Sequence, residues 1–391
     1  MRKISITILS LSLLTVMAGA AIAPSLSNLE QYFNESSTTL IKLIVTISSL
    51  FIIPSTFIVS KLNRKYNYKP LIIIGLILYL IGGLGGAFVN NIYVLLIFRS
   101  ILGIGVGFFM PFATSLVSDF FEGEKKATMM GMVSSSNNLG GIISLLLSGW
   151  LATISWRYSF GVYFLGFFVL LLVWIFLPNE RKKTKKGTET MKSKKNPLPK
   201  SVFTVGISMF LLILAFYSIP ANMSIYISQL NLGDSRVSSV VIAFISVSGF
   251  VAGFLYQKIK KQLNKMFLPV LLLLMAVGFL MIGTGTSMIM LSAGVFITGT
   301  GVGLFIPELY LKISNTVDKR STVSAMAIVS SMMFLGQFFS PIFLDFIGER
   351  FGNGNIRFPY LFLSISILIF MIGSIFTTTL KKPKKLEQTL S

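Results

Sequence analysis

Long apolar runs alternate with short polar segments along this 391-residue chain. Each run holds about 20 residues, which is the number that an α-helix needs to cross the hydrocarbon core of a bilayer. The runs predict twelve membrane-spanning helices, near residues 4–27, 41–60, 70–90, 92–117, 127–152, 158–178, 201–228, 236–257, 267–284, 288–312, 321–347 and 359–380. The first run looks like a signal peptide, but it is too long and has no clear cleavage site. We therefore expect it to be retained as a helix.

The second half of the chain repeats the first at an offset of 196 residues, and the match needs no gap. Duplicated sets of apolar helices are typical of transporters that hold their substrate between two repeats. We therefore predict an all-α membrane protein with two pseudo-symmetric six-helix bundles. The bundles are expected at residues 1–178 and 201–380, joined by a cytoplasmic basic linker at 179–200 and followed by a cytoplasmic basic tail at 381–391.

The clearest part of the repeat is a set of glycines in the fourth and tenth predicted helices. These glycines are Gly103, Gly105, Gly107, Gly299, Gly301 and Gly303. Because lipid gives helices little hydrophobic drive to associate, small residues four positions apart let helix backbones approach closely. Two interpretations stay open: static packing surfaces, or smooth surfaces on which helices slide during alternating access.

The composition fits a lipid solvent and excludes several kinds of chemistry. Apolar residues make up 53% of the chain and charged residues 12%, whereas soluble domains carry about 25% charged residues. The sequence has no Cys and no His, which removes thiol chemistry, the usual zinc ligand and the usual general base. It also has no nucleotide-binding loop. We expect no enzyme activity, no metal and no cofactor, with a proton gradient as the energy source.

Most of the net charge of +21 falls on alternate connections between the predicted helices. This bias places the Lys-rich connections and both termini in the cytoplasm of a multi-pass protein of the cell membrane. Anionic lipid accounts for these lysines, so we expect no nucleic-acid partner. The expected partners are a small-molecule substrate and membrane lipid, and the chain is expected to be a monomer.

Three segments resemble signatures of the major facilitator superfamily. Arg99, followed by the glycines of the fourth helix, resembles its motif B, and residues 60–75 are similar to its motif A, with Arg64 in place of an acidic residue. Ser155-Trp156-Arg157 resembles a segment of the drug-exporter branch. The Gly-Pro of the antiporter motif is replaced by Ser144-Leu145. The resemblance implies the twelve-helix fold of that superfamily, alternating access, and export in exchange for protons.

Charged residues within the spans are the candidates for proton coupling. Arg99 lies inside the fourth helix, where it either serves function or snorkels to the outer interface. Glu308 is the one acidic residue well within an apolar span, and Lys312 follows four residues later on the same helix face. A carboxylate in a low-dielectric site takes up protons more readily than one in water. Glu308 is therefore the first candidate for the proton site, and a structural Glu308–Lys312 pair is the alternative.

Neutral polar residues within apolar spans are candidates for the substrate path. They are Asn137, Asn138, Asn222, Tyr226 and Gln337. Each could instead satisfy a backbone carbonyl of a neighbouring helix. The apolar surroundings favour an amphipathic or hydrophobic compound over a sugar, which demands many hydrogen-bonding side chains.

Three classes of function stay open at the level of sequence. The first is a secondary carrier for proton-coupled efflux of small amphipathic or hydrophobic compounds, as in multidrug resistance. The second is a carrier for proton-coupled uptake of a polar or anionic nutrient, with Arg99 and Lys42 as anion ligands. The third is a membrane sensor or lipid scramblase on the same fold.

Overall fold

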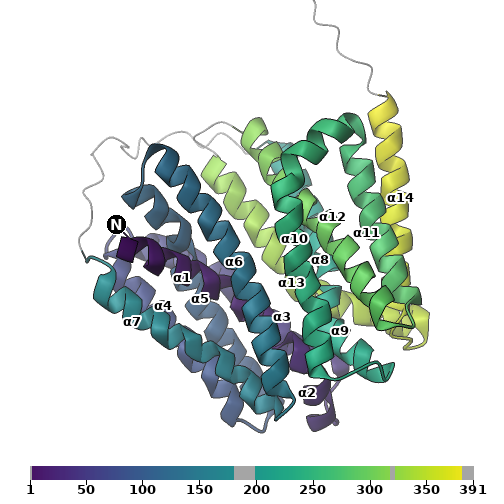
Figure 1. The fold of residues 1–391 in the computed structure, drawn as a ribbon, viewed down its shortest axis with the longest axis horizontal. Helices are drawn as coiled ribbons and strands as arrows, with labels where there is room; N and C mark the ends of the chain where they lie inside the picture. Colours follow the sequence, from purple (N-terminus) through teal and green to yellow (C-terminus); the bar gives the residue numbers. More distant parts are fainter. Residues whose placement is uncertain (1, 180–198, 318–321, 381–391) are drawn as a thin grey trace, which may run out of the picture.

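The computed structural model describes residues 2–179, 199–317 and 322–380, and these residues form helices and short connections. The first half contains α1 (Arg2–Ala20), α2 (Leu26–Tyr32), α3 (Thr38–Leu62), α4 (Tyr68–Gly85), α5 (Ile92–Phe120), α6 (Gly123–Ala152) and α7 (Leu165–Phe176). The second half contains α8 (Lys200–Phe216), α9 (Ser218–Gln229), α10 (Ser235–Leu263), α11 (Phe267–Thr284), α12 (Met288–Thr316), α13 (Thr322–Gly352) and α14 (Phe358–Leu380). Figure 1 shows the two halves as neighbouring bundles. Most of the predicted linker and the tail 381–391 lie outside the described residues.

The helices are long and apolar enough to account for the predicted spans. Ten stretches meet both conditions, and one of them, Ser235–Thr284, contains two helices, α10 and α11, joined by the short 3-10 helix η4 (Asn264–Met266). The less apolar α6 is a further long helix. Counting α1 with α2, and α8 with α9, as single interrupted helices gives twelve crossings in the described residues. The all-α fold with twelve helices is confirmed.

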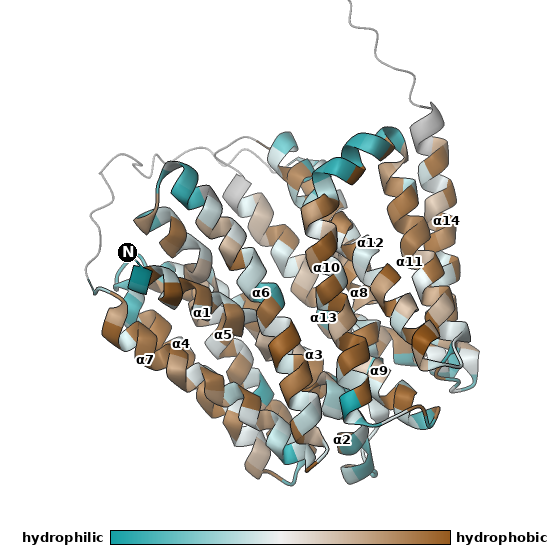
Figure 2. Cartoon of the chain, in the orientation of Figure 1, coloured by the Kyte–Doolittle hydropathy of each residue, from teal (hydrophilic) through white to brown (hydrophobic). Residues whose placement is uncertain are grey.

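Polar side chains at the helix starts show the repeat directly. Asn91 accepts hydrogen bonds from the backbone N–H groups of Tyr93 and Val94 at the start of α5. Ser287, which stands at the equivalent position of the second half, accepts one from Met290 at the start of α12. Such caps satisfy N–H groups that have no partner inside the helix. In Figure 2 hydrophilic residues gather at helix ends, as at the α10–α11 connection, and hydrophobic residues cover the lengths between them.

The repeated glycines pack helices together inside each bundle. A Cβ on Gly103 would overlap the backbone of α3, and one on Gly105 would lie 2.5 Å from the backbone nitrogen of Tyr79 in α4. In the second half, a Cβ on Gly299 would overlap a side chain of α10, and one on Gly301 would lie 2.6 Å from Met275 of α11. Gly107 and Gly303 meet the same neighbours, α3 and α10. These six close contacts all lie within one half, which favours the packing interpretation over surfaces that slide between the halves.

Candidate functional site

The helices α6 and α10, which come from different halves, touch at one end and separate toward the other. A Cβ on Gly149 would overlap Ser239, and one on Gly141 would lie 2.9 Å from Ser246 Oγ. A Cβ on Gly131, Gly249 or Gly253, farther along the same two helices, would have nothing within 4 Å. We call the end with α2 the closed end and the end with the α10–α11 connection the open end; they lie at the bottom and top of Figure 1.

A cavity of about 680 Å³ occupies the space between the diverging helices. Its walls come from both halves, with residues of α1 and α6 facing residues of α8, α9, α10 and α12. Aromatic side chains include Phe216, Tyr217, Phe250 and Phe254, and polar ones include Ser134 and Asn138. None of the described residues that line this cavity is charged. The cavity thus offers apolar contact and a few hydrogen bonds, without a counter-ion.

Two interrupted helices meet at this cavity. The helix α1 ends at Ala20 and α8 ends at Phe216, which are equivalent positions of the repeat. Both residues line the cavity. A Cβ on Gly19 would lie 3.0 Å from the Tyr217 hydroxyl and 2.9 Å from Gln337 Nε2, so these polar atoms border one small space. Corresponding breaks in the two halves of a transporter are the usual place of its substrate site.

Arg99 does not line the cavity; it is fully buried inside the first half. Its Nε donates to the carbonyl of Ile44 at 2.6 Å, and its Nη2 donates to the carbonyl of Ala18 at 2.6 Å. Its Nη1 donates to the Tyr163 hydroxyl at 2.5 Å. The expected snorkelling to the outer interface does not occur. Arg99 instead ties α3 to the carbonyl end of α1, just before that helix breaks, and its part in a protonation step stays a prediction.

The predicted pair of Glu308 with Lys312 is not formed. Glu308 makes a salt bridge with Lys260 at 2.6 Å and accepts a hydrogen bond from the Tyr256 hydroxyl at 2.6 Å. Lys312 is exposed. Tyr256 and Lys260 lie one turn apart on α10, so both side chains reach the same carboxylate. A pair with Lys312 along α12 itself would contribute only about 0.2–0.5 kcal/mol of stability, which does not compete with these two contacts.

Lys42 also has a partner that the sequence did not reveal. Its ammonium lies 2.5 Å from Asp345 Oδ1, and Thr39 donates a hydrogen bond to Asp345 Oδ2 at 2.8 Å. The side chains of Lys42 and Asp345 are only 6% and 13% exposed. This salt bridge joins α3 to α13, and so one half to the other, at the closed end. In this structure the partner of Lys42 is thus a carboxylate of the protein, and its role as an anion ligand stays a prediction.

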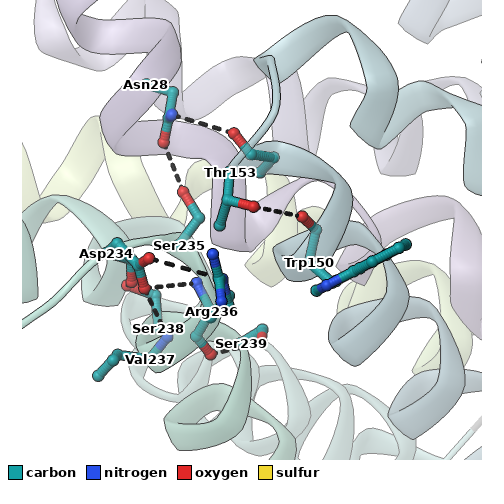
Figure 3. A network of polar contacts seen from close by, with 10 residues as sticks. Asn28, Trp150, Thr153, Asp234, Ser235, Arg236, Val237, Ser238 and Ser239 are labelled. Carbon is teal, nitrogen blue, oxygen red and sulfur yellow. Dashed lines mark hydrogen bonds and ion pairs between the residues drawn. The ribbon is translucent and has the colours of Figure 1, made fainter.

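A second set of polar contacts joins the halves at the closed end. Figure 3 shows Asn28 between the end of α6 and the start of α10. Its Nδ2 donates to the carbonyl of Ala152 at 3.3 Å, and its Oδ1 accepts from Ser235 Oγ at 2.5 Å. Nearby, Ser224 donates to the carbonyl of Pro24 at 2.6 Å, and its hydroxyl lies 3.0 Å from that of Ser27. These groups are uncharged, in contrast to the Lys42–Asp345 pair.

The neutral candidates from the sequence fall into two groups. Asn138 lines the large cavity, and Gln337 hydrogen-bonds Tyr217 beside it. Asn137 of α6 lines a second cavity of about 260 Å³, which is also bordered by α1, α3, α5 and α13. Asn222 donates to the carbonyl of Ser218 at 2.9 Å, and Tyr226 donates to that of Ile282 at 2.8 Å. The first group lies in or beside the two cavities, although Asn138 also donates to the carbonyl of Ser134 at 3.2 Å. The second group donates to backbone carbonyls in the second half.

Sequence reasoning missed Tyr217, Phe250 and Asp345. Tyr217 carried a usable signal, because it stands three residues before Pro220 in a span that repeats the first helix. Asp345 gives no such signal, because it lies near the end of its apolar run, where water is expected to reach a carboxylate. In the structure it is nearly buried and contacts Lys42 and Thr39 of the other half.

The comparison with known proteins agrees with this architecture. The family model of the Major Facilitator Superfamily matches residues 8–341 and, in an overlapping match, residues 265–390. The chain belongs to the Major Facilitator Superfamily. It is a multi-pass membrane transporter and not an enzyme.

Similar proteins in this family include exporters. The chain is 25% identical to the bacillibactin exporter of Bacillus subtilis (strain 168) over 358 residues, which cover 86% of this chain and 87% of the relative. It is 24% identical to the multi-drug resistance efflux pump PmrA of Streptococcus pneumoniae over 307 residues, which cover 74% and 75%. Among solved structures, it resembles a D-xylose-proton symporter with a TM-score of 0.75, at 16% identity and with 94% and 96% of the chains covered. That last likeness concerns the fold alone.

Proposed function

We propose that this superfamily member is a secondary active exporter of small, uncharged hydrophobic or amphipathic compounds, working by alternating access in exchange for protons. The observation that carries the proposal is the large cavity: it is open at one end, rich in aromatic side chains, and lined by no charged residue among those described. A sugar would need many directed hydrogen bonds, which this lining does not supply. A charged substrate would lose its hydration without gaining a counter-ion.

The orientation follows from the charge pattern. The open end carries the basic α10–α11 connection, with Lys258, Lys261 and Lys265, and the positive-inside bias assigns that end to the cytoplasm. The cavity then faces the cytoplasm, where an exporter collects its substrate. The efflux pumps among the relatives support the same direction. We place the monomeric transporter in the cell membrane with both termini inside.

Tyr217 is the residue that we expect to orient the substrate. It lines the cavity where the two interrupted helices meet, and its hydroxyl lies beside Gly19 and Gln337. Phe216 and Phe250 give an aromatic ring apolar surface to pack on. The favoured substrate therefore has an apolar, ring-containing body and one hydrogen-bonding group.

Uptake of an anionic nutrient has no observation in its favour. Both cations named for it are engaged by the protein, Arg99 with two backbone carbonyls and a tyrosine, and Lys42 with Asp345. Glu308 remains our candidate for the proton site, now with Lys260 as the partner from which protonation would release it. A sensor or scramblase on this fold is tested by the same transport experiment.

The test is transport in everted membrane vesicles loaded with an acidic lumen. An exporter exchanging substrate for protons should accumulate uncharged fluorescent dyes in the lumen and release protons from it, and dissipating the gradient should stop both. Glu308→Gln should abolish the gradient-driven part and leave counterflow intact. If Lys260→Gln restores gradient-driven transport to Glu308→Gln, then Glu308 only pairs with Lys260. Accumulation of a polar anion by right-side-out vesicles, without dye export, would overturn the proposed direction and substrate class.

A further inference from the structure

The second cavity lies at the place that the internal repeat assigns to a copy of the large cavity. At the offset of 196 residues, α13 corresponds to α6 and α3 corresponds to α10. Ser135 of α6 lines the large cavity, and its equivalent Ser331 of α13 lines the second cavity. Pro307 and Pro111 are likewise equivalent, and each lines one of the two cavities. The duplication has therefore built two related cavities, one beside α6 and α10 and the other beside α13 and α3.

The two cavities differ at the residues that α10 and α3 contribute. Gly249 and Gly253 of α10 line the large cavity, and a Cβ on either would meet nothing within 4 Å. Their equivalents on α3 are Ile53 and Phe57, which line the second cavity and fill part of the corresponding space. The volumes follow this difference, with about 680 Å³ for the large cavity and about 260 Å³ for the second. Drug-sized ligands occupy cavities of about 300–1,000 Å³, so the second cavity suits a smaller molecule.

The polar groups of the second cavity define the chemistry of a suitable occupant. Asn137 Oδ1 lies 3.2 Å from the Thr15 hydroxyl, whereas the amide nitrogen of Asn137 has no partner among the described residues. Thr56 and Ser331 donate their hydroxyl hydrogens to carbonyls of their own helices at 2.7 and 2.9 Å, so both hydroxyl oxygens can still accept. None of the described residues that line this cavity is charged. A hydroxyl group, which both donates and accepts, matches this set.

The apolar part of the lining favours a ring, and its position ties the cavity to one arrangement of the halves. Phe57, Met110 and Phe334 offer apolar surface on which a ring can pack. The walls come from α1, α3, α5 and α6 of the first half and from α13 of the second. When the open end closes during alternating access, the halves approach each other there and this space shrinks.

We propose that the second cavity is a binding site for small uncharged ring compounds that carry one hydroxyl group. The ring packs on the aromatic and methionine side chains, and the hydroxyl accepts from Asn137 and donates to a hydroxyl oxygen of the wall. An occupant that binds only while the open end is apart favours that arrangement and so slows the transport cycle. This last effect rests on the proposed export function, whereas binding itself does not.

Binding is tested by protection of a single cysteine, because the chain contains no cysteine of its own. Ser331→Cys places a thiol in the wall of the second cavity, and Ser135→Cys places one at the equivalent position of the large cavity. Ser324→Cys is the control, since Ser324 is exposed on α13 and lines neither cavity. The rate of modification by a small water-soluble thiol reagent is measured on the full chain in lipid nanodiscs, with phenol as the probe.

Phenol should slow modification of Ser331→Cys in a saturable way, with half-protection on the order of 1 mM, and should leave Ser324→Cys unchanged. Toluene has the same size without the hydroxyl and should need about a fivefold higher free concentration. In Asn137→Leu, which keeps the side-chain size and removes the amide, phenol should lose most of this advantage over toluene. A purely structural role of Asn137 would weaken both probes equally.

The size of the probe gives a second test that does not depend on Asn137. The larger 2-naphthol should protect Ser331→Cys less well than phenol does, yet it should protect Ser135→Cys in the roomier large cavity. Phe57→Ala should reverse the order of the two probes at Ser331→Cys, and Phe57 is 51% exposed, so its truncation should not prevent folding. Phe254→Ala, at an exposed phenylalanine of the large cavity, is the matched control and should leave the order unchanged.

Three results would refute the second site. They are full reactivity of Ser331→Cys in saturating phenol, equal protection of Ser324→Cys, which would indicate an effect on the membrane, and equal potency of phenol and toluene. Phenol should also slow dye export from everted vesicles at saturating dye, and Asn137→Leu should raise the required concentration about fivefold. Protection of Ser331→Cys without slower export would show that the occupant does not favour the open arrangement. The protection assay needs no transport, so it is decided separately from the export function.

Discussion

The two crossings between the halves at the closed end occupy equivalent places in the repeat, yet they are held by different means. At the crossing of α3 with α13, Lys42 and Asp345 form a buried salt bridge. At the crossing of α6 with α10, Gly149 lets the backbones approach and Ser239 fills the contact. The first contact depends on ionisation and the second on shape. A duplicated fold can therefore keep one geometry while only one of its two copies acquires a charged pair.

Charge reversal at the first crossing should have the largest effect. Lys42→Glu places a second carboxylate against Asp345 in a buried site, and we expect the closed end to lose about 3–5 kcal/mol of stabilisation. Transport in everted vesicles should fall to background, although abundance in the membrane stays near normal. Combining the change with Asp345→Lys should recover most of the transport, because the pair is restored with exchanged partners. If the charge swap does not restore transport, the crossing does not depend on this pair.

Filling the second crossing should have the next largest effect. A side chain at Gly149 overlaps Ser239 and approaches the carbonyl of Ser235, so Gly149→Leu should disfavour closure by about 1–3 kcal/mol. Spin labels at Glu35→Cys and Arg350→Cys, two exposed sites on the two halves at the closed end, should then lie farther apart than in the otherwise unchanged protein, as measured by double electron–electron resonance. Gly373→Leu is the control, because a Cβ there meets nothing within 4 Å. A closed and active Gly149→Leu protein would mean that α6 and α10 do not need close contact.

A smaller effect is expected from a change at Tyr217, which should alter substrate binding without altering closure. Tyr217→Phe removes one hydroxyl beside Gln337 and leaves the aromatic wall in place. Affinity for a dye with a carbonyl group should weaken by about 1 kcal/mol, or roughly fivefold. Affinity for a matched hydrocarbon dye should not change, and neither should the label distances. Equal losses for the two dyes would show that Tyr217 acts by packing alone.

The smallest effect is expected from Asn28, whose hydrogen bonds bridge α6 and α10 in Figure 3. Asn28→Ala should weaken closure by about 0.5–1 kcal/mol, because its partners lie near the helix ends, where water can replace the amide. Distances between spin labels at the closed end should lengthen only slightly. A shift as large as that of Gly149→Leu would show that hydrogen bonds, and not close packing, hold the second crossing.

The lengths of the apolar runs predicted the helices well because spanning a bilayer imposes a minimum length on each of them. The offset of 196 residues predicted equivalent contacts, and the glycines of α5 and α12 do meet corresponding neighbours. Prediction was poorer for side-chain partners. The pair of Glu308 with Lys312 on its own helix, which the sequence offered as an alternative, is not formed, and Glu308 pairs with Lys260 on another helix. These helices carry apolar residues on nearly all faces, so hydrophobic periodicity did not show which face meets which neighbour.

By itself the sequence determined the solvent, the all-helical class and the duplication, because each follows from local composition or from self-similarity along the chain, and the resemblance of three segments to known motifs indicated the superfamily. Only the tertiary structure decided which polar groups meet. Lys42 and Asp345 are 303 residues apart in the sequence, and they meet because the two bundles are tilted into contact at the closed end. The same tilt separates the helices at the open end and forms the cavity that Tyr217 lines. The relative orientation of two rigid bundles depends on the sum of many contacts across their interface, and no single segment of the chain encodes it.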